Sequence, residues 1–271
     1  MHITDLVEAK WTNPDVFREQ YVSAEPFPHI VMEDFIRPDI LKRVEAEFPD
    51  LAKQSGDVIT FDDQLQIKLA SRGMGGLSES AFKLISGLNS DVFLNYLQSL
   101  TGIDEPLISD PYLAGGGYHE IKTGGLLKVH ADFNKHSMLD LDRRLNLLIY
   151  LNKNWNRDWG GELQLFNADM SGPVVSVPPR FNTAVVFTTT SYTYHGHPDP
   201  LACPPDRSRR SLALYYFSTG RPDHEVSGKH STLFKERQGE SWARPKTTLK
   251  SVVKDLCPPI LIKAAKSIAR R

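Results

Sequence analysis

The clearest pattern along the chain is an alternation of apolar and polar side chains in residues 144–152. Residues i and i+2 of a strand face the same side of a sheet. One face of this segment is therefore made by Leu145, Leu147, Ile149 and Leu151, and the other by Arg144, Asn146, Leu148, Tyr150 and Asn152. The alternation predicts a β-strand with one apolar and one mixed face.

Short apolar segments separated by turn residues continue through the middle of the chain. Glycines at 115–117 and 124–125 bracket one short strand. Further strands are predicted at 126–130, 162–166, 174–177, 183–188 and 211–218. Many short strands at regular spacing are typical of a sandwich, barrel or jelly roll. Residues 108–222 are therefore predicted to form an all-β core.

Helical periodicity dominates the first third of the chain. Residues 13–51 are predicted to be helical apart from one strand at 27–32, with Pro38 near the start of a helix, where its missing N–H costs nothing. A glycine-rich break at 71–76 precedes a second helical stretch at 78–100. The expected fold class is α+β, in which residues 1–107 pack on the core 108–222 and residues 223–271 form a C-terminal extension.

The composition is that of a globular protein with enough apolar material for a sizeable core. Of the 271 residues, 40% are hydrophobic and 24% are charged. Two cysteines, Cys203 and Cys257, offer no disulfide framework. The N-terminal residues contain acids and no apolar segment like that of a signal peptide. A cytoplasmic location is therefore expected.

The charge is distributed unevenly along the chain. Residues 246–271 contain seven bases and one acid and carry +6, so residues 1–245 carry −7 of the chain's net −1. An acidic body argues against a nucleic-acid partner. The basic tail has an apolar stripe and is read as helical. Two interpretations stay open for it: weak contact with the inner face of an anionic membrane, or a helix docked on the body.

Candidate chemistry begins with His130-Ala131-Asp132, which ends a predicted apolar strand. Because positions i and i+2 share a face, one imidazole and one carboxylate can reach the same ion. A third ligand would come from the stretch after the predicted strand 183–188, where His195 and His197 both occur. Two histidines and one carboxylate leave coordination positions open, as Fe(II) oxygenases require. A zinc hydrolase can use the same residue types, but no HExxH sequence is present.

A basic pair opens the last predicted strand of the core. An arginine that projects into a β-core is costly unless it meets an anion, and a small dicarboxylate would satisfy it. Counting back from Tyr215 by twos places Ala213, Ser211 and Arg209 on one face, which favours Arg209 over Arg210 for this role. The alternative is that both arginines lie at a strand end exposed to solvent. His119 and Glu120, before the HAD motif, have two interpretations: they reach the pocket, or they lie on a strand surface, and the second is favoured.

Taken together, six elements resemble the prolyl 4-hydroxylase-like branch of the 2-oxoglutarate/Fe(II) oxygenases. The resemblance covers about residues 110–220, in the order found in that family. Its elements are HAD at 130–132, RLNLLIYLNKNW at 144–155, GGEL at 160–163, VPP at 177–179, YHGH at 194–197 and RRSLALYYF at 209–217. The resemblance implies a double-stranded β-helix, or jelly-roll, core.

The resemblance also implies roles for individual residues. His130, Asp132 and His195 would be the catalytic metal ligands. Tyr150 and Arg209 would bind the distal carboxylate of 2-oxoglutarate, and Leu163 would form an apolar wall of that pocket. The implied cofactors are Fe(II), 2-oxoglutarate and O₂, with ascorbate as a candidate addition.

The implied activity is hydroxylation of an unactivated C–H bond, with release of succinate and CO₂. The substrate is left open among amino acids, peptidyl residues, small metabolites and glycans. We expect residues 56–76 to border its pocket. The alternative is a non-catalytic β-helix protein that binds metal for structure or sensing. Tyr150 and Arg209 argue against it, because a structural site has no use for a dicarboxylate pocket.

Overall fold

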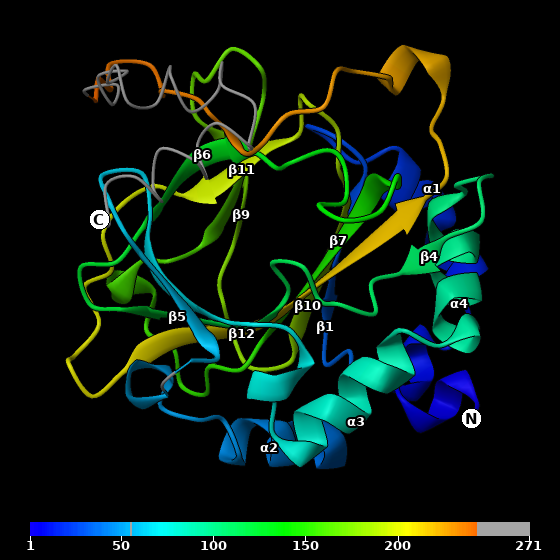
Figure 1. Ribbon diagram of the computed structural model, residues 1–271, viewed down its shortest axis with the longest axis horizontal. Coiled ribbons are helices and arrows are strands. Elements are labelled where there is room, and N and C mark those ends of the chain that lie inside the picture. The colour runs from blue at the N-terminus through cyan, green and yellow to red at the C-terminus, as the bar shows by residue number, and fades with distance from the viewer. Residues whose placement is uncertain (55, 243–271) are drawn as a thin grey trace, which may run out of the picture. The chain divides into compact units, whose positions relative to one another are not determined.

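Two antiparallel sheets face each other in the computed structural model, which describes residues 1–54 and 56–242 (Figure 1). The larger sheet has the order β1 (His29–Glu33), β10 (Thr183–Thr188), β7 (Asp142–Tyr150), β12 (Ser208–Ser218), β5 (Gly117–Lys122), β3 (Ile67–Ser71) and β2 (Val58–Asp62), with β4 (Ile108–Ser109) paired to β12. The smaller sheet has the order β13 (Leu233–Phe234), β6 (Leu127–Ala131), β11 (Tyr194–His197), β8 (Leu163–Phe166) and β9 (Pro173–Val177). The expected α+β jelly-roll architecture is confirmed.

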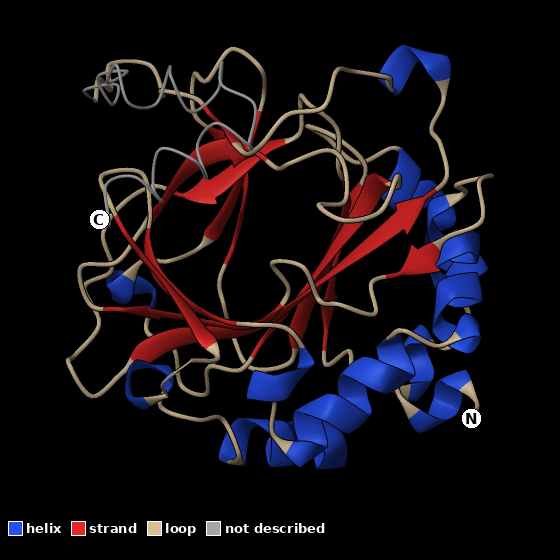
Figure 2. Cartoon of the chain, in the orientation of Figure 1, coloured by secondary structure: helices blue, strands red, loops and turns tan. Residues whose placement is uncertain are grey.

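Helices cover the outer face of the larger sheet, away from the smaller one (Figure 2). They are α1 (Arg18–Val22), α2 (Pro38–Ala46), α3 (Glu79–Leu88) and α4 (Asp91–Thr101). Short 3-10 turns lie at Ile3–Asp5, Ala9–Trp11, Pro14–Phe17, Leu51–Lys53, Met74–Gly76, Arg157–Trp159 and Asp223–Glu225. Within the described part of the chain, no helix combines the length and apolar character needed to cross a bilayer.

The alternation in β7 determines which side of the larger sheet meets the helices. Leu145, Leu147 and Ile149 are fully buried in one core together with apolar residues of α2, α3 and α4. The opposite face of β7 turns toward the smaller sheet, where Tyr150 packs with Leu163. The helices and the larger sheet thus share a core. The chain divides into compact units at 1–239 and 240–271, and the predicted boundaries at 107 and 222 stay predictions.

The predicted helix at 78–100 is two helices, and the expectation of a single stretch was wrong. The backbone of Ser90 is extended (φ −78°, ψ 158°), and its hydroxyl donates to Gly87 O at 2.6 Å. This bond from the serine side chain to a carbonyl of α3 competes with the backbone bonds that a continuous helix would make. The break lets α3 and α4 run in different directions along the sheet (Figure 1).

Residues 56–76 contain a β2–β3 hairpin that the sequence pattern did not predict. β2 is an edge strand of the larger sheet, and among the described residues no strand pairs with its outer edge. At the hairpin turn, Ile67 N donates to Leu126 O at 2.8 Å, and Lys128 N donates to Leu65 O at 2.8 Å. The hairpin therefore connects the edge of the larger sheet to β6 of the smaller one. The predicted tail helix falls on residues outside the described part.

Candidate metal centre and dicarboxylate pocket

Three candidate metal ligands meet where β6 and β11 run side by side. The antiparallel register places His195 opposite His130, and Asp132 follows β6 directly. One ligand atom from each of these residues lies within 4.8 Å of the others. Gly196 permits this close pairing, because a Cβ there would lie 2.8 Å from Leu127 O. Local strand geometry and one cross-strand pair are thus enough to assemble the cluster.

Hydrogen bonds orient both imidazoles toward the carboxylate. His130 Nδ1 lies 2.8 Å from Lys128 O, and His195 Nδ1 lies 3.1 Å from Thr193 O. A carbonyl can only accept, so each Nδ1 carries the proton and each Nε2 lone pair is free. His130 Nε2 is 3.5 Å from Asp132 Oδ1, and His195 Nε2 is 3.4 Å from Asp132 Oδ2. Burial lowers the pKa of His130, which keeps its ring in the neutral form that binds metals.

Asp132 is itself held by two residues of β7. Arg143 Nη2 donates to Asp132 Oδ2 at 3.0 Å, and Asn146 Nδ2 donates to the same oxygen at 2.7 Å. Burial alone would raise the pKa of this carboxyl, but the Arg143 guanidinium holds it well below its usual range. Such partners orient and tune a metal ligand. Asp132 is therefore ionised and fixed.

A β-bulge turns Arg143 toward Asp132. Leu145 faces Tyr216 of β12 and Arg143 faces Phe217, so Arg144 is the residue that the β7–β12 register skips. Bulges re-aim side chains in this way and are common beside active sites. The Arg143 guanidinium carbon lies 3.5 Å from the ring centroid of Tyr215. Regular alternation could not have predicted this contact.

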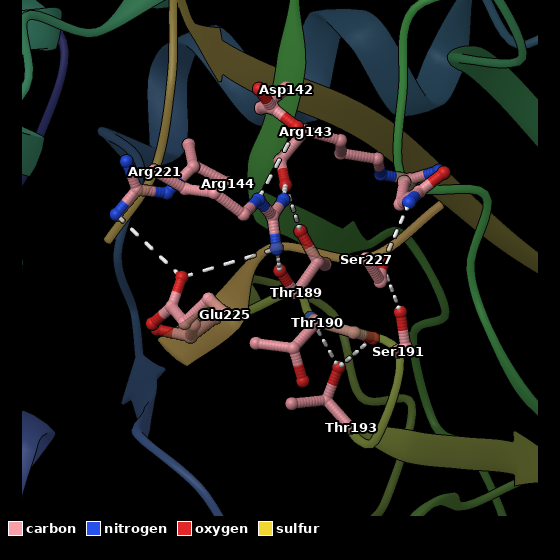
Figure 3. Close-up of polar contacts among 12 residues, drawn as sticks. Asp142, Arg143, Arg144, Thr189, Thr190, Ser191, Thr193, Arg221, Glu225 and Ser227 are labelled. Carbon is pink, nitrogen blue, oxygen red and sulfur yellow. Dashed lines mark hydrogen bonds and ion pairs between the residues drawn. The ribbon is translucent and has the colours of Figure 1, made fainter. Parts of the chain in front are cut away.

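The segment before His195 is tied to β7 and to residues 221–230 (Figure 3). Thr189 Oγ1 donates to Arg143 O at 3.0 Å, and Arg221 also donates to that carbonyl. Ser191 Oγ lies 2.7 Å from Ser227 Oγ. Arg221 Nε also lies 3.4 Å from the carboxylate of Asp142 on β7. These contacts fix the course of the chain between β10 and β11, and with it the position of His195.

The predicted dicarboxylate pocket lies on the inner face of β7, β8 and β12. Arg209, 5% exposed, donates through Nη2 to Tyr150 Oη at 3.1 Å and through Nε to Gly161 O at 2.7 Å. Gly161 has φ +77°, and a Cβ there would lie 3.1 Å from Arg209 Cδ. Burial raises the pKa of Tyr150, so its hydroxyl keeps a proton to donate. Leu163 lines the same cavity.

Arg210 faces the other way. Its Nε donates to Ser208 Oγ at 3.0 Å and lies 3.6 Å from Glu120 Oε1, and its guanidinium covers the ring of Phe48. Glu120 is buried rather than on a strand surface, so that interpretation was wrong. It was also wrong for His119, which lines the cavity, donates through Nε2 to Gly115 O at 3.0 Å, and has its pKa lowered by burial to about 3.

His197 is buried near the cluster but does not belong to it. A register irregularity separates it from His195 on β11. Within residues 1–54 and 56–242, neither of its ring nitrogens has a hydrogen-bond partner. Burial, with a contribution from Arg209, holds the pKa of His197 well below its usual range. The structure thus brings His195, not His197, together with His130 and Asp132.

Three hollows follow one another from the cluster to the surface. The inner pocket, about 70 Å³, contains the three candidate ligands, Leu163 and Arg209. The vestibule, about 190 Å³, shares Lys68, His119 and Asp132 with it. The outer groove, about 800 Å³, shares Ile59, Gly115 and Phe133 with the vestibule. The β2–β3 hairpin supplies Ile59 and Lys68, which places part of residues 56–76 beside the candidate site.

The sequence reasoning missed Arg143, Asn146 and Lys68. Asn146 carried a usable signal, since it shares the mixed face of its strand with Tyr150. Arg143 depends on the bulge and Lys68 on the pairing of β3 with β5. These two are tertiary features that no local pattern reveals.

Comparisons with known proteins point to one superfamily. Residues 116–217 match the family model of the 2OG-Fe(II) oxygenase superfamily. Over 201 residues the chain is 28% identical to a prolyl 3-hydroxylase, OGFOD1, of Xenopus laevis, a match that covers 70% of this chain and 36% of that protein.

Two solved structures share the fold. A prolyl-4-hydroxylase of Pseudomonas putida superposes with a TM-score of 0.53 at 17% identity, over 76% of this chain and all of the other. A prolyl hydroxylase of Trichoplax adhaerens, in complex with a hypoxia inducible factor peptide fragment, gives a TM-score of 0.56 at 18% identity. This superposition covers 77% of this chain and 91% of the other. The Fe(II) and 2-oxoglutarate typical of the superfamily fit the donor set and the Arg209 pocket. In residues 116–217 this chain is therefore similar to the 2OG-Fe(II) oxygenase superfamily, and its fold is shared with the two prolyl hydroxylases compared.

Proposed function

We propose that this protein is an Fe(II)- and 2-oxoglutarate-dependent hydroxylase that oxidises a prolyl residue within a polypeptide. The observation that carries the proposal is one cavity that contains both a His-Asp-His cluster and a buried arginine. The ligand atoms of His130, Asp132 and His195 lie within 4.8 Å of one another, and Arg209 lines the same pocket. A purely structural metal site needs no such arginine.

In this proposal His130, Asp132 and His195 hold the iron. Two imidazoles and one carboxylate suit Fe(II) and leave positions for a co-substrate and O₂. Arg143 and Asn146 take one carboxylate oxygen of Asp132, which restricts how that ligand can turn. When bound, the iron and 2-oxoglutarate supply the oxidation of a C–H bond, with succinate and CO₂ as co-products.

Arg209 and Tyr150 would bind the distal carboxylate of 2-oxoglutarate. Arg209 is buried, and among the described residues no carboxylate pairs with its guanidinium. A buried cation without a counter-ion is costly, so an anionic ligand would relieve this cost. Because the guanidinium donates to Tyr150 Oη, the phenol proton is available for the same carboxylate. Leu163 would exclude water from the chain of the co-substrate.

The substrate class rests on the outer groove and on the relative. A groove of about 800 Å³ that leads into the vestibule is larger than a free amino acid needs and suits an extended chain. The curated relative is a prolyl 3-hydroxylase, and the chain spans 36% of its length. Both observations favour a peptidyl prolyl substrate over a free amino acid or small metabolite.

The test is turnover by purified protein reconstituted with Fe(II), ascorbate and 2-oxoglutarate. Proline-containing peptides, free L-proline and oligosaccharides would be supplied in turn, and succinate and the mass of each product measured. We expect one oxygen atom to be added to a peptide, with one succinate per product. Metal binding without any absorption change on anaerobic addition of 2-oxoglutarate would support the non-catalytic alternative instead.

A further inference from the structure

Lys68 is a cationic side chain that lines the cavity and has no role in the function proposed above. It lies on β3, and it lines both the inner pocket and the vestibule. Its Nζ is 4.9 Å from the ring centroid of Phe61. Within residues 1–54 and 56–242, no hydrogen bond or ion pair partners this ammonium. Its pKa is lowered to about 8, chiefly by burial, so it remains mostly protonated at neutral pH.

With iron and 2-oxoglutarate bound, the charges around the site would leave the Lys68 ammonium without a counter-ion. Asp132 is the only acid among the described residues that line the inner pocket and the vestibule, and Arg143 already pairs with it at 3.0 Å. Of the two carboxylates of 2-oxoglutarate, one would bind the iron and the distal one would pair with Arg209. One ammonium then remains without an anion at the point where the substrate must enter.

The outer groove has the same sign of charge. Arg72, Lys135 and Lys229 lie along it, and none of the described residues that line it is an acid. Lys135 pairs with Asp142 at 3.2 Å, whereas Arg72 and Lys229 have no ion-pair partner within the described part of the chain. Apolar side chains, including the exposed Tyr112 and Met138, make up much of the groove. The occupant that complements this surface is a chain with apolar and acidic side chains.

We propose that Lys68 is a specificity-determining residue, whose ammonium pairs with an acidic side chain of the substrate polypeptide close to the oxidised residue. The proposal rests on the function proposed above and adds the charge of the substrate to it. Arg72 and Lys229 would favour further acidic side chains along the groove. The chain's own basic tail, residues 246–271, has the wrong charge to be the occupant.

The test is the binding of labelled proline-centred peptides to the full-length protein, measured by fluorescence anisotropy. Three peptides would differ only at the residues beside the proline, which are Glu, Gln or Lys. The proteins compared are the wild type, Lys68→Met and Lys68→Glu. A matched control is Lys83→Met, because Lys83 is an exposed lysine on α3 that pairs with Glu79. Binding of 2-oxoglutarate to the Mn(II)-loaded protein would be measured for each.

We expect the wild type and Lys83→Met to bind the Glu peptide roughly tenfold to a hundredfold more tightly than the Gln peptide, as one charged contact allows. Lys68→Met should lose that preference, and Lys68→Glu should prefer the Lys peptide. The Kd for 2-oxoglutarate should stay within about threefold across the series, since such a difference amounts to less than one direct contact.

Three outcomes would overturn the proposal. The first is an unchanged preference in Lys68→Met, or no peptide binding at millimolar concentrations. The second is a large loss of 2-oxoglutarate affinity in Lys68→Met with no change in peptide preference, which would assign Lys68 to the co-substrate. The third is displacement of the peptides by free L-proline in a Lys68-dependent manner. Failure of the proposed function looks different: the Glu peptide binds through Lys68 but gains no oxygen.

Discussion

Removal of the Arg209 guanidinium gives the most direct measure of the dicarboxylate pocket. Arg209 Nε donates to Gly161 O at 2.7 Å, and Arg209 Nη2 donates to Tyr150 Oη at 3.1 Å. The remaining N–H groups of the guanidinium are therefore available to a ligand. A hydrogen bond to a charged group contributes about 1.5–3 kcal/mol, and about 1.4 kcal/mol corresponds to a tenfold change in affinity. Arg209→Met should therefore weaken 2-oxoglutarate binding roughly tenfold to a hundredfold.

The assay is anaerobic titration of the Fe(II)-loaded protein with 2-oxoglutarate, with the iron content measured in parallel. Arg210→Met is the matched control, because its side chain covers Phe48 and pairs with Glu120 on the opposite face. The control should change the Kd by less than about twofold, which is below the effect of one hydrogen bond. Equal losses in both variants would refute the assignment of Arg209 to the inner face, as would a loss of iron that parallels the loss of 2-oxoglutarate.

Four further expectations follow. His195→Ala should lose most of the bound iron and His197→Ala should retain it, because only His195 lies in the cluster; iron content in the reverse order would exchange their roles. Arg143→Met should weaken Fe(II) binding roughly tenfold to a hundredfold, since a hydrogen-bond partner of a ligand is lost; chelator competition measures this, and unchanged affinity would contradict it. Burial lowers the pKa of His119 to about 3, so below about pH 6.5 the unfolded chain binds a proton that the folded chain does not. The stability of the folded protein therefore falls as pH falls. In urea unfolding of the metal-free protein between pH 6.5 and 5, His119→Gln should lose about 1 kcal/mol less per pH unit than the wild type; equal slopes would count against a neutral His119 in the folded protein. Finally, removal of residues 246–271 should abolish salt-sensitive sedimentation with anionic liposomes, to which each base contributes about 1 kcal/mol at most; a full-length chain that does not sediment would end the membrane interpretation.

Local patterns were sufficient where one strand defines the geometry. His130 and Asp132 share a face because they are two residues apart, and the choice of Arg209 over Arg210 follows from the same period. Leu145, Leu147 and Leu151 likewise pack in the core shared with the helices as one face. In each case the period of two in an extended chain fixes the relative direction of the side chains, whatever the strand pairs with.

Local patterns failed where the backbone departs from regular geometry. The bulge at Arg144 breaks the period and turns Arg143 toward Asp132. The cap at Ser90 divides a helix that continuous apolar spacing had suggested. The bulge depends on how β7 pairs with β12, and the helix break depends on the backbone of one residue, so the spacing of apolar residues records neither.

By itself, the sequence determined the all-β core, the His-x-Asp pair and the strand that carries Arg209, because each depends on a repeat of a few residues; the jelly roll followed only from the resemblance to a known family. Only the tertiary structure decided which distant groups share the cavity. It placed His195 opposite His130 through the β6–β11 register, and it brought Lys68 to the vestibule because β3 pairs with β5. Contacts of this kind depend on strand order and register, which are set by how the whole chain buries its apolar faces.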